Sequence, residues 1–143
     1  MTAISWSDAA ALIDGAGLAH LATASSTGEP HVAMVSAVLD GDVVLFATRR
    51  TSGKARDLGA NQRASFMWQG NSAETYLWGD VELLDDPTLK VQVWNSGIFP
   101  YPLEHFFGTA DSPEWLLVRV TPTRVVAMVQ TDTALERRVW SRS

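Results

Sequence analysis

Cysteine is absent from this chain of 143 residues, which excludes disulfides, thiolate catalysis and cysteine-ligated metals. No apolar run approaches the roughly 20 residues that a membrane-spanning helix needs. Positive charge is also scarce, because 11 Lys and Arg face 16 Asp and Glu and the net charge is −5. Non-specific affinity for nucleic acids grows with accumulated positive charge. We therefore expect neither a membrane nor a nucleic acid as partner.

The remaining composition is that of an ordinary globular protein, with 46% hydrophobic and 19% charged residues. Its length predicts one domain over residues 1–143. The first residues lack a basic segment and carry Asp8 and Asp14 inside their apolar patch, which is unlike a signal peptide, so we expect a cytoplasmic protein. The histidines lack metal-ligand spacing, and no metal site is expected. His20 lies in an apolar stretch and is interpreted as a satisfied core histidine.

Short apolar stretches separated by turn residues predict a mainly β protein. Strands are expected at residues 18–25, 31–39, 43–47, 63–69, 74–84, 115–121 and 124–130, the last two split at Pro122. Gly79 is expected to mark a bulge or a close backbone approach. Short helices are expected at 5–15, with Ser7 as N-cap, at 53–58, stopped by Gly59, and at 88–95. Residues 97–113 read as irregular and 131–143 as a polar tail with an optional short helix. Hairpin-like links favour an antiparallel sheet closed into a barrel.

Hydroxyls and cations fill the short link between a predicted buried strand and a predicted helix start. They are Thr48, Arg49, Arg50, Thr51, Ser52 and Lys54. A helix start offers free backbone N–H groups and the positive end of the helix dipole, which suits a phosphate. A solvated basic loop is the alternative interpretation. The order of strand, hydroxyl, cations, small residue and helix favours an anion site.

Four motifs follow one another along the chain: Leu21-Ala22-Thr23, Gly28-Glu29-Pro30-His31-Val32, Leu45-Phe46-Ala47-Thr48, and Ser52-Gly53-Lys54-Ala55-Arg56-Asp57-Leu58 with Asn61. With them the chain resembles the pyridoxamine 5′-phosphate oxidase-like FMN-binding split barrels, and within these the general stress protein 26 branch, from about Trp6 to Met128. The resemblance implies a split β-barrel of about six to seven mostly antiparallel strands. It also implies a homodimer that binds FMN at the subunit interface. Some relatives bind the deazaflavin F420 instead, and a few bind haem.

The resemblance also implies which residues contact the cofactor. The strand segment Val32, Ala33, Met34 and Val35 would run past the flavin ring, and Thr48, Arg49, Ser52, Gly53 and Lys54 would hold the phosphate. An aromatic residue of the partner subunit often covers the ring in this branch. Trp94, Trp115 and the pair Phe106-Phe107 all remain open for that role. Arg50 leaves room for a longer anionic cofactor, such as F420.

One family element is missing. The phosphate oxidases proper carry an Arg-x-His-x-Arg element late in the chain, whereas the tail Glu136-Arg137-Arg138-Val139-Trp140 has no histidine. The departure argues against vitamin B6 oxidation. No residue is predicted as a catalytic acid or base, which suits chemistry carried by the flavin. We therefore expect an FMN-dependent oxidoreductase with an unknown small-molecule substrate. The alternatives are an F420-dependent reductase of the same fold, a non-catalytic flavin-binding stress protein and, with least support, a haem-binding relative.

Overall fold

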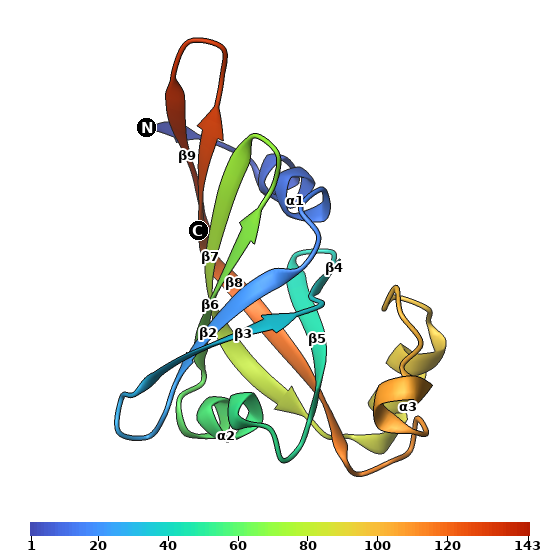
Figure 1. Ribbon diagram of the computed structural model, residues 1–143. Helices are drawn as coiled ribbons and strands as arrows, with labels where there is room; N and C mark the ends of the chain where they lie inside the picture. The colour runs from blue at the N-terminus through green and yellow to red at the C-terminus, as the bar shows by residue number, and fades with distance from the viewer.

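One nine-stranded sheet organises the protein, whose computed structural model describes residues 1–143 (Figure 1). The hydrogen-bonded strand order is β1-β9-β8-β7-β6-β2-β3, with β5 beside β8 and β4 beside β5. The strands are β1 (Thr2–Ala3), β2 (Ala19–Ala24), β3 (Pro30–Val35), β4 (Val38–Asp40), β5 (Val43–Arg49), β6 (Arg63–Gln69), β7 (Ala73–Leu84), β8 (Trp115–Gln130) and β9 (Leu135–Ser141). The helices are α1 (Trp6–Asp14), α2 (Gly53–Ala60), α3 (Pro87–Asn95) and α4 (Glu104–Phe107). None of them has the length and apolar character required to cross a bilayer.

Strand β8 is the element at which the sheet divides. It pairs with β7 along one edge, while its other edge pairs with β5 in the first half and with β9 in the second. The sheet therefore forks, and the path of hydrogen bonds is not cyclic. The structure confirms a mainly β split barrel, but the expected full closure is wrong.

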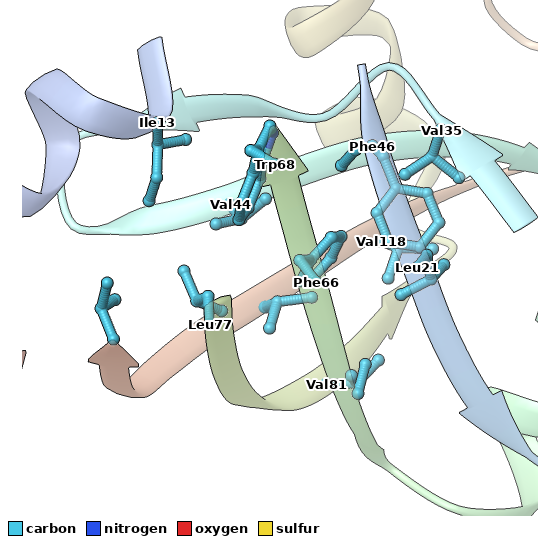
Figure 2. Close-up of a cluster of buried hydrophobic side chains, with 14 of the residues drawn as sticks. Ile13, Leu21, Val35, Val44, Phe46, Phe66, Trp68, Leu77, Val81 and Val118 are labelled. Atoms are coloured by element: carbon cyan, nitrogen blue, oxygen red, sulfur yellow. The ribbon is translucent and has the colours of Figure 1, made fainter. Parts of the chain in front are cut away.

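The main core lies inside the barrel and consists of aliphatic residues around three aromatic rings, those of Phe46, Phe66 and Trp68 (Figure 2). Phe66 stacks on Trp68 with ring centroids 5.3 Å apart, and Phe46 meets Phe66 edge-on at 6.1 Å. A second cluster lies on the other face of β5 and β8, where Leu45 packs with Trp115. Because β5 is buried on both faces, the position of the link that follows it is fixed.

The helices differ from expectation at their ends. Helix α1 is capped by Ser5, not by Ser7, because Ser5 and Asp8 form a reciprocal capping box. Helix α2 continues through Gly59 to Ala60, because Gly59 does not adopt the left-handed conformation that ends many helices. Asn61 ends it instead, and its side-chain amide donates hydrogen bonds to two carbonyl groups at the end of β2, at 2.6 and 2.9 Å.

Several strands also differ from expectation. Residues 31–39 form two strands, β3 and β4, rather than one, and residues 131–143 contain β9 in place of a polar or helical tail. Residues 115–130 form one strand rather than two, because Pro122 pairs with Gly79 at a register shift that accommodates it. A Cβ atom on Gly79 would lie 2.6 Å from Val120 Cγ1, which confirms the predicted close approach.

Candidate functional site

The link between β5 and α2 forms a rigid helix start. Thr48 is buried at the end of β5, and its Oγ1 lies 3.0 Å from Ser52 Oγ. Ser52 is the N-cap of α2 and accepts a hydrogen bond from the Ala55 backbone N–H at 3.1 Å. The first turn of α2 therefore presents its remaining N–H groups in a fixed direction.

Helix α2 is itself held against the sheet. The buried carboxylate of Asp57 accepts a hydrogen bond of 2.9 Å from the Thr23 hydroxyl of β2. Asn61 ties the other end of the helix to the end of β2. These contacts orient the helix start without using any group that faces the pocket.

Three cations gather at this helix start without forming an ion pair. They are Arg49, Lys54 and Arg56, and none of their side chains makes a hydrogen bond within the chain. The Arg56 guanidinium reaches back over the first residue of α2, since its Nη2 lies 3.6 Å from the position that a Cβ on Gly53 would take. Positive charge is therefore uncompensated at this point of an acidic protein, which suits an anionic ligand.

An open pocket of about 470 Å³ begins at this charged site. Its lining residues are Leu18, Met34, Val35, Ser36, Ala47, Thr48, Arg49, Ser52, Lys54, Tyr101, Phe106 and Phe107. The lining residues of the β5–α2 link are cationic or carry hydroxyls and are called here the cationic end, and those from residues 101–107 are aromatic and are called the aromatic end. The lining contains no carboxylate and no imidazole. Such a pocket suits an elongated ligand with an anionic group at one end and a flat apolar body at the other.

The structure brings together six of the residues predicted for cofactor binding, namely Met34, Val35, Thr48, Arg49, Ser52 and Lys54. Gly53 is the first residue of α2, directly beside them. Val32 and Ala33 lie on β3 but do not line the pocket.

Trp94 and Trp115, which were predicted as candidates for covering the cofactor ring, both belong to the second hydrophobic cluster. Trp115 is fully buried, and its ring lies 5.5 Å from that of Trp94 and 6.0 Å from that of Phe107. Neither tryptophan lines the pocket. That one of them covers the cofactor of a partner subunit stays a prediction.

Arg50 turns away from the pocket, which corrects the expectation that it extends the anion site. Its Nη2 donates a hydrogen bond to Asp85 at 2.6 Å, and its Nε donates one to the Pro113 carbonyl at 2.7 Å. The hydrogen bond from Arg50 lowers the pKa of the Asp85 carboxyl, and Lys90 acts in the same direction. Lys90 is itself buried, and its Nζ lies 3.4 Å from Asp85 and 5.0 Å from the centre of the Trp115 ring. Within the basic cluster of the sequence, Arg49 and Lys54 thus line the pocket, whereas Arg50 joins separate segments of the chain.

Tyr101 was not among the predicted site residues. It lines the pocket, and its hydroxyl has no hydrogen-bond partner in the chain. Burial raises the pKa of this hydroxyl above its usual value, so it remains a neutral donor at physiological pH. The signal in the sequence was the long aromatic loop of residues 97–113, because long loops in compact domains are often functional.

The outer face of the sheet is apolar next to the pocket. Two rows of side chains cross β3, β2, β6 and β7, one of them Met34, His20, Met67 and Tyr76, the other Val32, Ala22, Ser65 and Trp78. Val32 is 63% exposed and Met34 is 57% exposed. His20 lies in this face with its Nδ1 buried and unpaired, so the interpretation as a satisfied core histidine is wrong.

Fold and pocket together define a split β-barrel with a cationic helix start at a largely apolar pocket. Residues 6–128 match the profile of the pyridoxamine 5′-phosphate oxidase family, and the chain belongs to that family.

Solved structures with the same fold include three informative relatives. General stress protein 26 from Bacillus anthracis str. Sterne is 18% identical, with 97% of this chain and 100% of that chain covered and a TM-score of 0.73. A pyridoxamine 5′-phosphate oxidase-related FMN-binding protein from Nostoc punctiforme is 17% identical, with 95% and 86% covered and a TM-score of 0.72. An F420 reductase is 24% identical, with 80% and 93% covered and a TM-score of 0.65. A search among curated proteins finds no significant match.

Proposed function

We propose that this protein binds FMN, with the phosphate at the start of α2, and acts as a flavin-dependent oxidoreductase. The observation that carries the proposal is the convergence of Thr48, Ser52, Lys54 and Arg49 on one mouth of a pocket whose other end is apolar. Lys54 and Arg49 would neutralise the phosphate, and the hydroxyls and first-turn N–H groups would donate hydrogen bonds to its oxygens. The bound flavin would supply the redox chemistry.

The residues around the apolar end bind and orient rather than exchange protons. Met34, Val35 and Ala47 offer apolar surface, and the pocket lacks a carboxylate or imidazole. The pocket therefore favours transfer of electrons or hydride through the cofactor over acid–base catalysis by a side chain. Vitamin B6 oxidation remains disfavoured, because the arginines of β9 lie away from the pocket.

F420 is the second candidate cofactor. The observation that favours it is Arg56, an unpaired cation over Gly53 that does not line the pocket itself but adds to the positive charge of Arg49 and Lys54 beside it. A longer anionic tail than one phosphate could use this additional charge. Arg50 does not support F420 binding, because its guanidinium donates a hydrogen bond to Asp85 instead.

Titration of the purified apo-protein with FMN and with F420, followed by flavin and tryptophan fluorescence, separates these cofactors. Lys54→Ala should weaken binding of the preferred cofactor about ten-fold or more, since a charge-assisted contact of about 1.5–3 kcal/mol is lost. Arg137→Ala is the matched control, because it removes one exposed unpaired cation from β9, away from the pocket. An unchanged affinity in folded Lys54→Ala would remove this lysine from the site. Turnover of NADH or NADPH by the FMN-loaded protein would separate an enzyme from a non-catalytic flavin-binding protein.

We also propose that the protein is a homodimer formed through the apolar face of β3, β2, β6 and β7. The two central rows of this face carry no Asp, Glu, Lys or Arg, and Arg124, which lies over the Trp78 ring, places an unpaired charge only at the β8 edge of the face. A second copy can therefore cover the centre of the face without burying an unpaired charge. Met34 belongs to both the face and the pocket, which favours a cofactor site beside the interface.

Light scattering at micromolar concentration should therefore give twice the chain mass, and Val32→Glu should give a monomer with weakened FMN binding. Val32 is exposed in the single chain, so the substitution itself leaves the core intact. A wild-type monomer that binds FMN tightly would contradict a cofactor site at the interface.

A further inference from the structure

The two ends of the pocket differ in chemistry and come from different parts of the chain. The cationic end belongs to the β5–α2 link, whereas the aromatic end belongs to residues 97–113, between α3 and β8. In this second segment Tyr101, Phe106 and Phe107 line the pocket. A ligand anchored by a phosphate at the first end would thus reach rings of the same chain at the second.

Phe106 differs from the aromatic residues around it in what covers its ring. Phe99 is buried, and Phe107 is stacked on Trp115 at an angle of 29°. Phe106 is 51% exposed at the pocket, and its close neighbour is Tyr101, whose ring meets it edge-on at 5.4 Å and 87°. The edge-on contact holds the ring in place while leaving surface for a flat ligand.

The segment that carries these rings is held firmly in place. Lys90 Nζ donates a hydrogen bond to the Ser112 carbonyl at 3.1 Å, and the indole N–H of Trp115 donates one to the Ala110 carbonyl at 3.1 Å. Arg50 donates one to the Pro113 carbonyl, and Arg50 directly follows the pocket residue Arg49. The part of the segment that leads into β8 is therefore anchored beside the β5–α2 link before a ligand arrives, which limits the ordering cost of binding.

The Tyr101 hydroxyl supplies a polar group within this otherwise apolar end. It has no partner in the protein, whereas the hydroxyls of Thr48 and Ser52 bond to each other at the cationic end. A hydrogen bond from a partly buried, unpaired hydroxyl to the ligand makes the free energy of binding more favourable. A flat ring system with a carbonyl or ring nitrogen at its edge provides one.

We propose that Tyr101 and Phe106 form the binding wall for the cofactor ring within a single chain. In this arrangement Phe106 packs against the flat ring, and the Tyr101 hydroxyl bonds to its polar edge. The inference rests on the proposed function, because the phosphate anchor sets which end of the ligand meets the wall. It assigns the ring cover to this chain rather than to an aromatic residue of a partner subunit.

The test compares FMN with riboflavin, which has the same ring and no phosphate. Phe106→Leu should weaken both ligands by a similar factor of about five or more, because it removes an aromatic contact to the ring. Tyr101→Phe should weaken both about three- to ten-fold through loss of one neutral hydrogen bond, and should shift the visible absorbance of bound FMN. Lys54→Ala should weaken FMN and leave riboflavin unchanged. Leu135→Ala, which shortens a similarly exposed apolar side chain on β9, should change neither.

The outcomes separate this inference from the proposed function. A wild-type protein that fails to bind FMN refutes the proposed function. A second outcome is that FMN binding depends on Lys54 but is unaffected in folded Phe106→Leu and Tyr101→Phe, with an unchanged flavin spectrum. This outcome overturns only the proposed role of Tyr101 and Phe106 as the wall for the ring. A loss confined to FMN in these two variants also overturns it, because a wall for the ring must act on riboflavin as well.

Discussion

Asp85 joins three segments of the chain, and its removal should destabilise the protein far more than its exposure suggests. Its Oδ1 accepts hydrogen bonds from Arg50 at 2.6 Å and from Lys90 at 3.4 Å. The Lys90 side chain is only 4% exposed, whereas Asp85 is 51% exposed. Asp85→Ala would leave the Lys90 ammonium buried with only the Ser112 carbonyl and the face of Trp115. An uncompensated buried charge is more costly than the loss of a surface ion pair.

The expected loss is about 1.5–3 kcal/mol, the range for hydrogen bonds to charged groups, and it stays below that of a fully buried pair because Asp85 is half exposed. The thermal midpoint should fall by roughly 5–9 °C, at about 3 °C per kcal/mol for a chain of this size. Asp80→Ala is the matched control, since Asp80 and Arg63 form an exposed pair at 3.8 Å and such pairs contribute about 0–1 kcal/mol.

Both variants should be unfolded by heat and by urea at equal protein concentration, with tryptophan fluorescence as the signal. Equal losses in Asp85→Ala and Asp80→Ala would refute the reasoning, because they would mean that burial of Lys90 adds nothing.

The pH dependence gives a second readout of the same contact. Because Arg50 lowers the pKa of Asp85 in the folded protein, the stabilisation is fully present above the ordinary carboxyl value of 3.8 and is lost as the pH falls through the lowered value. The difference between wild type and Asp85→Ala should thus be constant from pH 7 to about pH 5 and shrink below about pH 4. A difference that disappears already near pH 6 would point to another group.

Two glycine substitutions should have opposite signs. Gly79→Ala should destabilise the protein by about 2 kcal/mol or more in urea unfolding, because its Cβ would meet Val120 Cγ1 at 2.6 Å and the Thr121 carbonyl oxygen at 2.7 Å. A neutral Gly79→Ala would mean that β7 and β8 separate easily at this point. Gly59→Ala should stabilise by about 0.5 kcal/mol, since a Cβ there meets nothing within 4 Å and alanine favours the helix. A loss of stability at Gly59 would contradict the open space beside α2.

The sequence was informative where structure depends on neighbours along the chain. That Thr48, Ser52 and Lys54 meet at one pocket could be predicted, because they lie within seven residues and the helix start fixes their relation. The close approach at Gly79 could be predicted because glycine weakens a strand and is typically found inside one where a bulge forms or another backbone comes near.

The rest depends on contacts between distant segments. Nothing local distinguishes Arg50, which pairs with Asp85, from Arg49, which lines the pocket. Pro122 reads as a strand break unless its pairing with Gly79 is known. Strand β9 was missed because a strand covered on its outer edge only by the two-residue β1 needs few apolar residues, and its polar side chains pair with one another, as Arg138 does with Glu136 at 3.3 Å. Tyr101 could be assigned to the pocket only once the loop of residues 97–113 was placed against β5.

The fork at β8 has a consequence for the order in which the protein is assembled. Strand β5 has only two sheet neighbours, the three-residue β4 and the first half of β8, which follows almost 70 residues later in the chain. During synthesis the link between β5 and α2 therefore emerges early but lacks its main sheet neighbour until residues 115–120 have been made. Pocket residues Tyr101, Phe106 and Phe107 also precede β8, and Phe107 stacks on Trp115, the first residue of that strand. Under the proposed function, cofactor capture would accordingly be among the last events of folding, and a flavin signal would report a completed chain rather than a nascent one.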